Sequence, residues 1–125
     1  MEKIDIDEKF ALFRETWRPK TVARLNGQDV KIVKVEGTFP WHRHHEIEEM
    51  FLVWRGKFRV EFRDRSVELS PGQMIVVPRG IEHRTASDEG AEVIVFEPAD
   101  VVNTGDAPVS EFTAPGNAGY KAQFS

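Results

Sequence analysis

Near the middle of the chain stands the stretch Trp41-His42-Arg43-His44-His45-Glu46-Ile47-Glu48-Glu49, which carries three of the four histidines of the protein. On a β-strand, residues two apart project from the same face, so His42 and His44 are expected to direct their imidazoles to one point. A tight turn over residues 45–48 would start the returning strand at Glu49 and bring that carboxylate beside both rings. The stretch therefore predicts a histidine–carboxylate cluster between two strands. The alternative is that His42 and His44 are surface residues of an exposed loop.

The fourth histidine, His83, follows Pro78-Arg79-Gly80-Ile81-Glu82, where proline and glycine mark a turn leading into a strand. Three neutral imidazoles and one carboxylate suit a first-row ion such as iron, manganese, nickel, zinc or copper, and they suit calcium or magnesium poorly. The chain has no cysteine, which excludes disulfides, thiolate ligands and a cysteine nucleophile. We therefore expect one divalent transition-metal ion, and the candidate ligands are His42, His44, Glu49 and His83.

The residues around this stretch have the pattern of a β-protein. Residues 22–33 form two extended runs around Asn26-Gly27, the pair that best tolerates the positive φ angles of a two-residue hairpin turn. Further short β-type runs, separated by turn residues, lie at 50–54, 57–62, 66–69, 74–77 and 91–96, with a turn expected at 88–90 before the last of them. Strands at this spacing favour a sandwich or barrel.

Both ends of the chain differ from this pattern. Residues 7–13 are expected to form one helical turn, with Asp7 as its cap. After Pro98 the chain is rich in Gly, Ala, Pro and Ser, so residues 103–125 are predicted to form an arm or a loose tail. The expected organisation is an N-terminal segment at 1–20, a β-barrel at 21–100 and a C-terminal arm or tail at 101–125.

The composition agrees with one small globular domain. Of the 125 residues, 40% are hydrophobic and 30% charged, and no run approaches the roughly 18 apolar residues needed to cross a bilayer. The N-terminus is acidic with no apolar run behind it, which favours a cytoplasmic protein over a secreted one. The net charge is -4 and the basic residues lie among acidic ones, so neither a nucleic acid nor a membrane is expected as a partner.

Two blocks of the sequence resemble the paired motifs of the cupin superfamily. In the first, Gly37 is followed by four residues, His42-Arg43-His44, four residues, Glu49, six residues and Gly56. In the second, Gly72 is followed by five residues, Pro78-Arg79-Gly80, two residues and His83, and 15 residues (57–71) separate the blocks. The resemblance implies a double-stranded β-helix barrel, a form of jelly roll, in which His42, His44, Glu49 and His83 take the places of the metal ligands of the family.

The chain departs from the cupin pattern at two positions. The family often has one more residue between the first glycine and the H-x-H motif, and an asparagine where this chain has Ser87. Neither position is a ligand position, so both departures concern the loop geometry around the expected ion.

Several neighbours of the expected ligands are further candidates. Glu48 is an alternative carboxylate ligand, although the six residues from Glu49 to Gly56 favour Glu49. His45 and Glu46 are candidates for an acid or base beside the ion. Outside the ligand set, the residues selected as catalytic candidates are His45 and Glu48. Turn residues beside a metal loop are more often exposed to solvent.

Aromatic and apolar residues near the expected ion also allow two interpretations. Phe39 and Trp41 could wall the pocket mouth, and Met50 and Trp54 could face a partner subunit, with plain core packing as the alternative for each.

An ion in octahedral geometry with four protein ligands keeps two adjacent positions for a substrate, which suits chelation of a hydroxy-carbonyl compound or an enediolate. Small cupins, which this chain resembles, include dioxygenases, sugar and sugar-phosphate isomerases and lyases. The resemblance therefore implies a metal-dependent enzyme for a small polar organic substrate, with oxygenase or isomerase chemistry. The alternative is a non-catalytic cupin that binds or senses a small molecule. A homodimer is also expected, through the outer sheet or through addition of residues 21–25 to the sheet of a neighbour.

Overall fold

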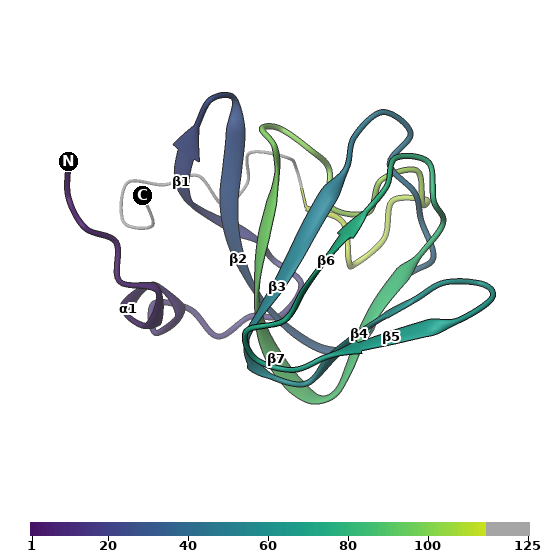
Figure 1. Ribbon diagram of the computed structural model, residues 1–125, viewed down its shortest axis with the longest axis horizontal. Coiled ribbons are helices and arrows are strands. Elements are labelled where there is room, and N and C mark those ends of the chain that lie inside the picture. Colours follow the sequence, from purple (N-terminus) through teal and green to yellow (C-terminus); the bar gives the residue numbers. More distant parts are fainter. Residues whose placement is uncertain (115–125) are drawn as a thin grey trace.

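A computed structural model describes residues 1–114 of the chain (Figure 1). Its elements are α1 (Ile6–Phe10), β1 (Lys20–Leu25), β2 (Gln28–Thr38), β3 (Glu49–Gly56), β4 (Phe58–Glu61), β5 (Ser66–Leu69), β6 (Met74–Val77) and β7 (Arg84–Pro98). The strands pair antiparallel in the order β1-β2-β7-β3-β6, and β4 pairs with both β5 and β7. The expectation of an all-β fold is confirmed.

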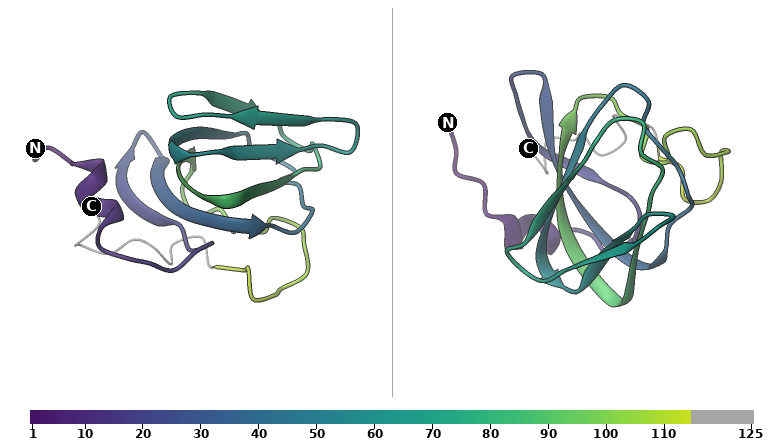
Figure 2. Two further views of the ribbon diagram at one scale, coloured as in Figure 1. Left: turned by 90° about the horizontal axis from the view of Figure 1, so that it is seen from below. Right: turned by 45° about the vertical axis from the view of Figure 1, so that its right-hand side comes forward.

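The long strand β7 closes the sheet into a barrel. Its first residues pair with β4, its later residues pair with β3, and β2 pairs with it from Thr38 back to Gln28. Because one strand belongs to both halves, the sheet curls around a common interior, as the two views of Figure 2 show. Pairs of strands linked in this way form the double-stranded β-helix that the cupin resemblance implied.

The hairpin expected from Asn26-Gly27 joins β1 to β2. Both turn residues have positive φ angles, 51° for Asn26 and 76° for Gly27, which is the conformation of a two-residue hairpin turn. Leu25 pairs with Gln28 across it. Local turn chemistry therefore sets the register of the two strands next to the turn, up to the shift between Ala23 and Thr21.

The turn expected at residues 88–90 is wrong as a strand boundary, because these residues lie inside β7. Val35 of β2 pairs with Ala91 and Gly37 pairs with Ser87, so residues 88–90 bulge out opposite Glu36 alone. The bulge has turn-like residues, but Ser87 stabilises it by donating from Oγ to the Lys57 carbonyl and accepting from the Gly90 amide. The strand therefore bends at this point and continues.

The helical turn also differs from the expectation. Helix α1 covers Ile6–Phe10, and Asp5 caps it by accepting a hydrogen bond from the Glu8 amide, so the cap expected at Asp7 is wrong. Asp7 instead accepts hydrogen bonds from the Trp54 indole and the Arg55 guanidinium on β3. These contacts, together with burial of Phe10, hold the helix against the outer face of the sheet.

Side chains bury on both faces of the sheet. The inner face holds the main cluster, which includes Val33, Val35, Phe51, Phe58 and Val93. A second cluster on the outer face lies beneath α1 and includes Phe10, Ile32 and Ile94. The barrel interior is therefore mostly apolar, which makes any charged group inside it notable.

Residues 101–114 form an irregular arm that packs against the loop between β2 and β3, drawn in yellow in Figure 1. Arg43 donates its amide to the Asp106 carboxylate, and the Asp106 amide bonds to the Arg43 carbonyl. The Asn103 side chain accepts a hydrogen bond from the Ala114 amide and donates one to the Phe112 carbonyl. This part of the predicted arm or tail is docked, and the part from residue 115 on lies outside the described residues. Within residues 1–114, no helix has the length and apolar character needed to cross a membrane.

Candidate metal centre

Backbone pairing brings the histidine-rich loop and the second motif together. His42 and His83 form a β-bridge in which each amide bonds to the carbonyl of the other residue at 2.9 Å. The chain bends at His45 and Glu46, and β3 begins at Glu49, as the sequence indicated. The loop after β2, the start of β3 and the start of β7 therefore meet at one end of the barrel.

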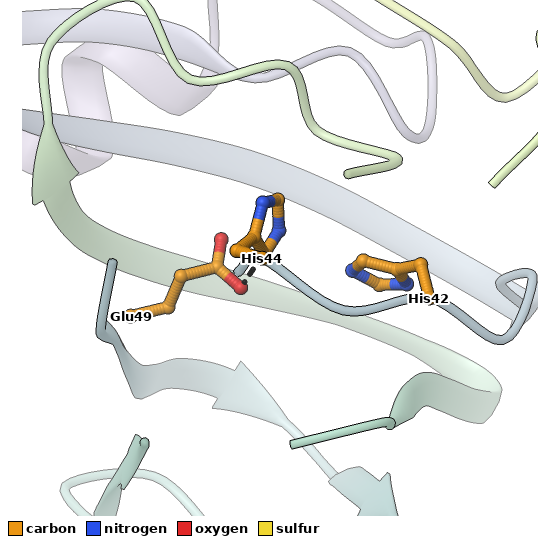
Figure 3. A group of neighbouring side chains, drawn as sticks. All are labelled: His42, His44 and Glu49. Atoms are coloured by element: carbon orange, nitrogen blue, oxygen red, sulfur yellow. Dashed lines mark ion pairs between the residues drawn. The ribbon is translucent and has the colours of Figure 1, made fainter. Parts of the chain in front are cut away.

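Three side chains form a compact cluster at this point. One ligand atom each of His42, His44 and Glu49 lies within 4.8 Å of the other two, and all three side chains are buried. His44 Nε2 lies 3.2 Å from Glu49 Oε1. Figure 3 shows the Glu49 carboxylate directed at His44, with His42 on the same loop.

His83 stands beside this cluster as its fourth member. Its Nε2 lies 3.5 Å from Glu49 Oε1, and its ring centre lies 4.4 Å from that of His42. The structure thus brings together all four residues that the sequence selected as ligands.

The hydrogen bonds of two rings fix their tautomers. The Nδ1 atoms of His42 and His83 lie 2.9 Å from the carbonyls of Pro40 and Ile81. A carbonyl only accepts, so each Nδ1 carries the proton and each Nε2 keeps its lone pair free. Rings held in this way are typical of metal ligands.

Unsatisfied atoms show that the cluster fits a metal ion. Among residues 1–114, His44 Nε2, His83 Nε2 and Glu49 Oε1 are buried and have no hydrogen-bond partner. Buried polar atoms without partners are rare and cost free energy. Here the atoms in question are the ones that would bind an ion, and nitrogen with carboxylate oxygen is a donor set for first-row metals.

A second carboxyl group lies against Glu49. Glu97 is buried on β7, and burial together with contact with Glu49 raises its pKa well above the usual range, although Lys31 opposes this. Burial favours the protonated form of Glu49 as well, but Glu97, His44 and His83 together hold the Glu49 pKa well below its usual range. Two carboxyl groups in contact do not both ionise readily, so in the metal-free protein Glu49 ionises before Glu97. The charge of a bound divalent ion would favour the ionised form of both.

Burial also acts on His42. Removal from water, followed by the nearby His83, lowers the pKa of His42 to about 4, against a smaller opposing effect of its bond to Pro40. The imidazole is therefore neutral at physiological pH, which is the form that binds a metal ion.

The cluster opens into a cavity of about 50 Å³ inside the barrel. His42 and Glu49 line one part of it, and its walls are mainly apolar side chains from β2, β3, β4 and β7. Lys31 and Glu97 also line it, as do Trp17 and Asn103 from the segments outside the strands. None of these four residues was predicted from the sequence to belong to the site. A charged residue within an apolar strand, as in Val30-Lys31-Ile32, was the available signal for Lys31.

The other candidates lie away from the cavity. The His45 side chain is 67% exposed and faces Asp106, and the Glu48 side chain is 55% exposed with Arg79 at 4.0 Å. Glu46 is also exposed. None of these three residues lines the cavity as residues 1–114 define it.

The two aromatic candidates take different positions. Phe39 lines the cavity and packs edge-on against His42, with ring centres 5.3 Å apart. Trp41 instead packs against the guanidinium groups of Arg63 and Arg84, whose Cζ atoms lie 3.9 and 4.7 Å from the centre of its ring. Phe39 is thus a wall of the pocket, and Trp41 belongs to a cation–π stack beside it.

Comparison with known proteins agrees with this geometry. The family described as "Cupin domain" matches residues 29–97. The crystal structure of a cupin-2 domain containing protein from Shewanella frigidimarina is similar with 39% identity and a TM-score of 0.75, covering 76% of this chain and 93% of that one. The crystal structure of protein NMB1881 from Neisseria meningitidis is similar with 29% identity and a TM-score of 0.72, covering 78% of this chain and 100% of that one. The uncharacterized protein YdbB of Bacillus subtilis is 27% identical over 84 residues, which is 66% of this chain and 68% of that protein.

Proposed function

We propose that this chain, which belongs to the cupin domain family, binds one divalent first-row transition-metal ion and acts as a metal-dependent enzyme on a small organic substrate. The ligands are His42, His44, Glu49 and His83. The observation that carries the proposal is that three of the four ligand side chains each leave a buried donor atom without a hydrogen-bond partner among residues 1–114. In an ordinary protein core, buried polar atoms nearly always have hydrogen-bond partners.

The chemistry follows from the number of ligands. An ion held by His42, His44, Glu49 and His83 would supply Lewis-acid chemistry for a hydroxy-carbonyl compound, and a redox-active ion would also support chemistry with dioxygen. The first would serve an isomerase reaction and the second an oxygenase reaction. The residues of the chain then supply orientation and exclusion of water.

Orientation comes from the backbone. The carbonyls of Pro40 and Ile81 hold the rings of His42 and His83 through Nδ1, so both Nε2 atoms point into the site without rotation of the rings. Glu97 lies against Glu49 and restricts the carboxylate. A site that is ordered before substrate arrives loses little entropy during the reaction.

Exclusion of water comes from the walls. Val33, Val35, Phe51 and Phe58 line the cavity next to the ligand cluster. Electrostatic interactions are stronger in such surroundings than in water.

The test begins with metal content. We expect protein purified without oxygen to carry about one ion per chain by elemental analysis, and His44→Ala to lose most of it, because His44 Nε2 has no other partner. His45→Ala is the matched control, since this adjacent histidine is 67% exposed and should leave the metal content unchanged. Equal metal content in the two variants would reject the ligand assignment.

Turnover is tested separately on the loaded protein. Enediols, catechols and hydroxy-carbonyl compounds are incubated with it, and products are sought by mass spectrometry. Product formation that His44→Ala abolishes supports an enzyme. A compound that binds tightly and is recovered unchanged supports the non-catalytic sensor instead.

A further inference from the structure

Inside the cavity lies a buried ion pair that the ligand cluster does not explain. Lys31 Nζ is 2.9 Å from Glu97 Oε1, and the two side chains are 4% and 3% exposed. An ammonium group has three N–H donors, and Glu97 is the partner that the structure gives Lys31 among residues 1–114. The remaining donors of Lys31 are therefore available to whatever fills the cavity.

A structural role accounts poorly for this pair. Its neighbours in the cavity wall, Val33, Phe51 and Val95, are apolar. Removing an ammonium from water costs several kcal/mol, and replacing a buried ion pair with apolar residues of similar volume is often neutral or stabilising. The free donors at this position point to an anionic ligand as the missing partner.

The register of the sheet places the pair next to the ligand cluster. Val95 of β7 pairs with Lys31 on β2 and with Phe51 on β3. Two residues further along β7 on the same face, Glu97 lies beside Lys31 and in contact with Glu49. Lys31, Glu97 and Glu49 thus form a row across three adjacent strands, and all three line the cavity that His42 enters.

The charges of the site indicate the sign of the ligand. Even with both glutamates ionised, a divalent ion together with the Lys31 ammonium leaves one net positive charge in the cavity. A singly charged anion would neutralise it. The apolar walls disfavour a polyhydroxylated compound, because its hydroxyl groups would remain without partners.

The volume of the cavity limits the size of the ligand. A water molecule needs about 10–15 Å³ of such space. A cavity of about 50 Å³ therefore holds a few water molecules or a ligand of few non-hydrogen atoms.

We propose, building on the metal-dependent function above, that Lys31 selects a small 2-hydroxy- or 2-oxocarboxylate as the ligand of this site. One carboxylate oxygen and the neighbouring hydroxyl or oxo oxygen face the histidine–glutamate cluster. The other carboxylate oxygen accepts a hydrogen bond from Lys31, which Glu97 holds in place. The small apolar remainder of the ligand lies against Val33 and Phe51.

The test measures binding rather than activity. Protein loaded with Ni²⁺ is titrated by calorimetry with lactate and with lactamide, which has the same shape and no charge. We expect the wild-type protein to prefer lactate by about 10-fold or more, and Lys31→Met to weaken lactate binding by about 10- to 100-fold with little change for lactamide. Lys34→Met is the matched control, because Lys34 lies on the same strand but bonds to the Phe13 carbonyl on the outer side.

A folding defect is separable from loss of recognition. If Lys31→Met does not fold, the double variant Lys31→Met/Glu97→Gln removes both charges of the pair and is expected to lose the preference for lactate equally. Equal binding of the two probes by the wild-type protein, binding of neither, or a preference that survives loss of Lys31 would each overturn the inference. Ni²⁺ content is measured independently, so a protein that takes up no ion overturns the metal function itself.

Discussion

The imidazole of His42 lies in the barrel interior, where burial and then the nearby His83 lower its pKa to about 4. In the unfolded chain the same group has a pKa of 6.5. At a pH between these two pKa values, His42 is protonated in the unfolded chain and neutral in the folded, metal-free protein. The contribution of His42 to stability is therefore complete above pH 6.5 and is lost as the pH falls towards 4.

This linkage gives a prediction for the metal-free protein. The free energy of unfolding of the wild-type protein, measured relative to that of His42→Leu, should fall by about 2 kcal/mol between pH 7 and pH 5. The comparison with the variant cancels the other titrating groups, including Glu97. Urea denaturation in the presence of a chelator measures it, and a difference that is constant across this range would contradict the assigned burial of His42.

Individual ligands were predictable from sequence, but their neighbours were not. One short loop links His42, His44 and Glu49, and His83 follows its own turn residues after β6, so sequence motifs identify all four. Lys31 and Glu97 join the site only because β2, β7 and β3 lie side by side in one particular register. That register depends on long-range pairing, which no local pattern of charge reveals.

At the scale of elements, two glycines with similar backbone angles have different reasons to be glycine. Gly56 ends β3 with φ +85°, and a Cβ there would lie 2.5 Å from the Gly90 carbonyl oxygen and 2.9 Å from Ala91 Cα. Gly72 has φ +87°, but a Cβ there would meet nothing within 4 Å. The first glycine therefore permits close approach of β3 to the β7 bulge, whereas the second serves only the turn.

Alanine substitutions at Gly56 and Gly72 separate the energetic cost of a positive φ angle from the cost of a steric clash. Gly72→Ala should cost about 1–2 kcal/mol because alanine is strained at positive φ. Gly56→Ala should cost about 1–3 kcal/mol more, because backbone atoms of β7 must also move. Midpoints of urea unfolding compare them. Equal stability of the two variants would mean that β7 leaves room for a Cβ atom at Gly56.

The same bulge shows why element boundaries were harder to predict than elements. Asp88-Glu89-Gly90 has the composition of a turn, and nothing local distinguishes a turn from a bulge that long-range pairing keeps inside a strand. For the helix, Asp5 and Asp7 are both acceptable caps by residue type. Asp7 instead accepts hydrogen bonds from Trp54 and Arg55, which lie far from it in the sequence.

The segments before β1 and after β7 pack together at one end of the barrel. Trp17 packs against Phe39 and Phe112, with ring centres 4.9 and 6.0 Å away. Arg18 donates to the carbonyls of Glu111 and Phe112, so the segment before β1 and the arm after β7 hold each other at the cavity. Residues 101–114 therefore form part of the pocket end of the protein, although their composition alone favoured an arm or a loose tail.

Residues 1–114 cover the outer face of the sheet only in part. Helix α1 lies over Ile32 and Ile94, but beyond it Met50 pairs with Val76 and Leu52 pairs with Met74. Met74 and Val76 are 54% and 52% exposed. Adjacent exposed apolar side chains on a sheet face favour a protein partner, and the face continues the buried cluster under α1. We therefore propose that a second copy of the chain covers it.

The expected result is a dimer of the wild-type protein by light scattering at micromolar concentration. Val76→Lys should shift it to a monomer, because an ammonium group would be buried in an apolar interface. Val109→Lys is the matched control, since Val109 is 88% exposed on the arm and distant in sequence from the face. A monomeric wild-type protein would reject the dimer altogether. A Val76→Lys protein that stays dimeric would instead place the interface at β1, which stands at the other end of the strand order.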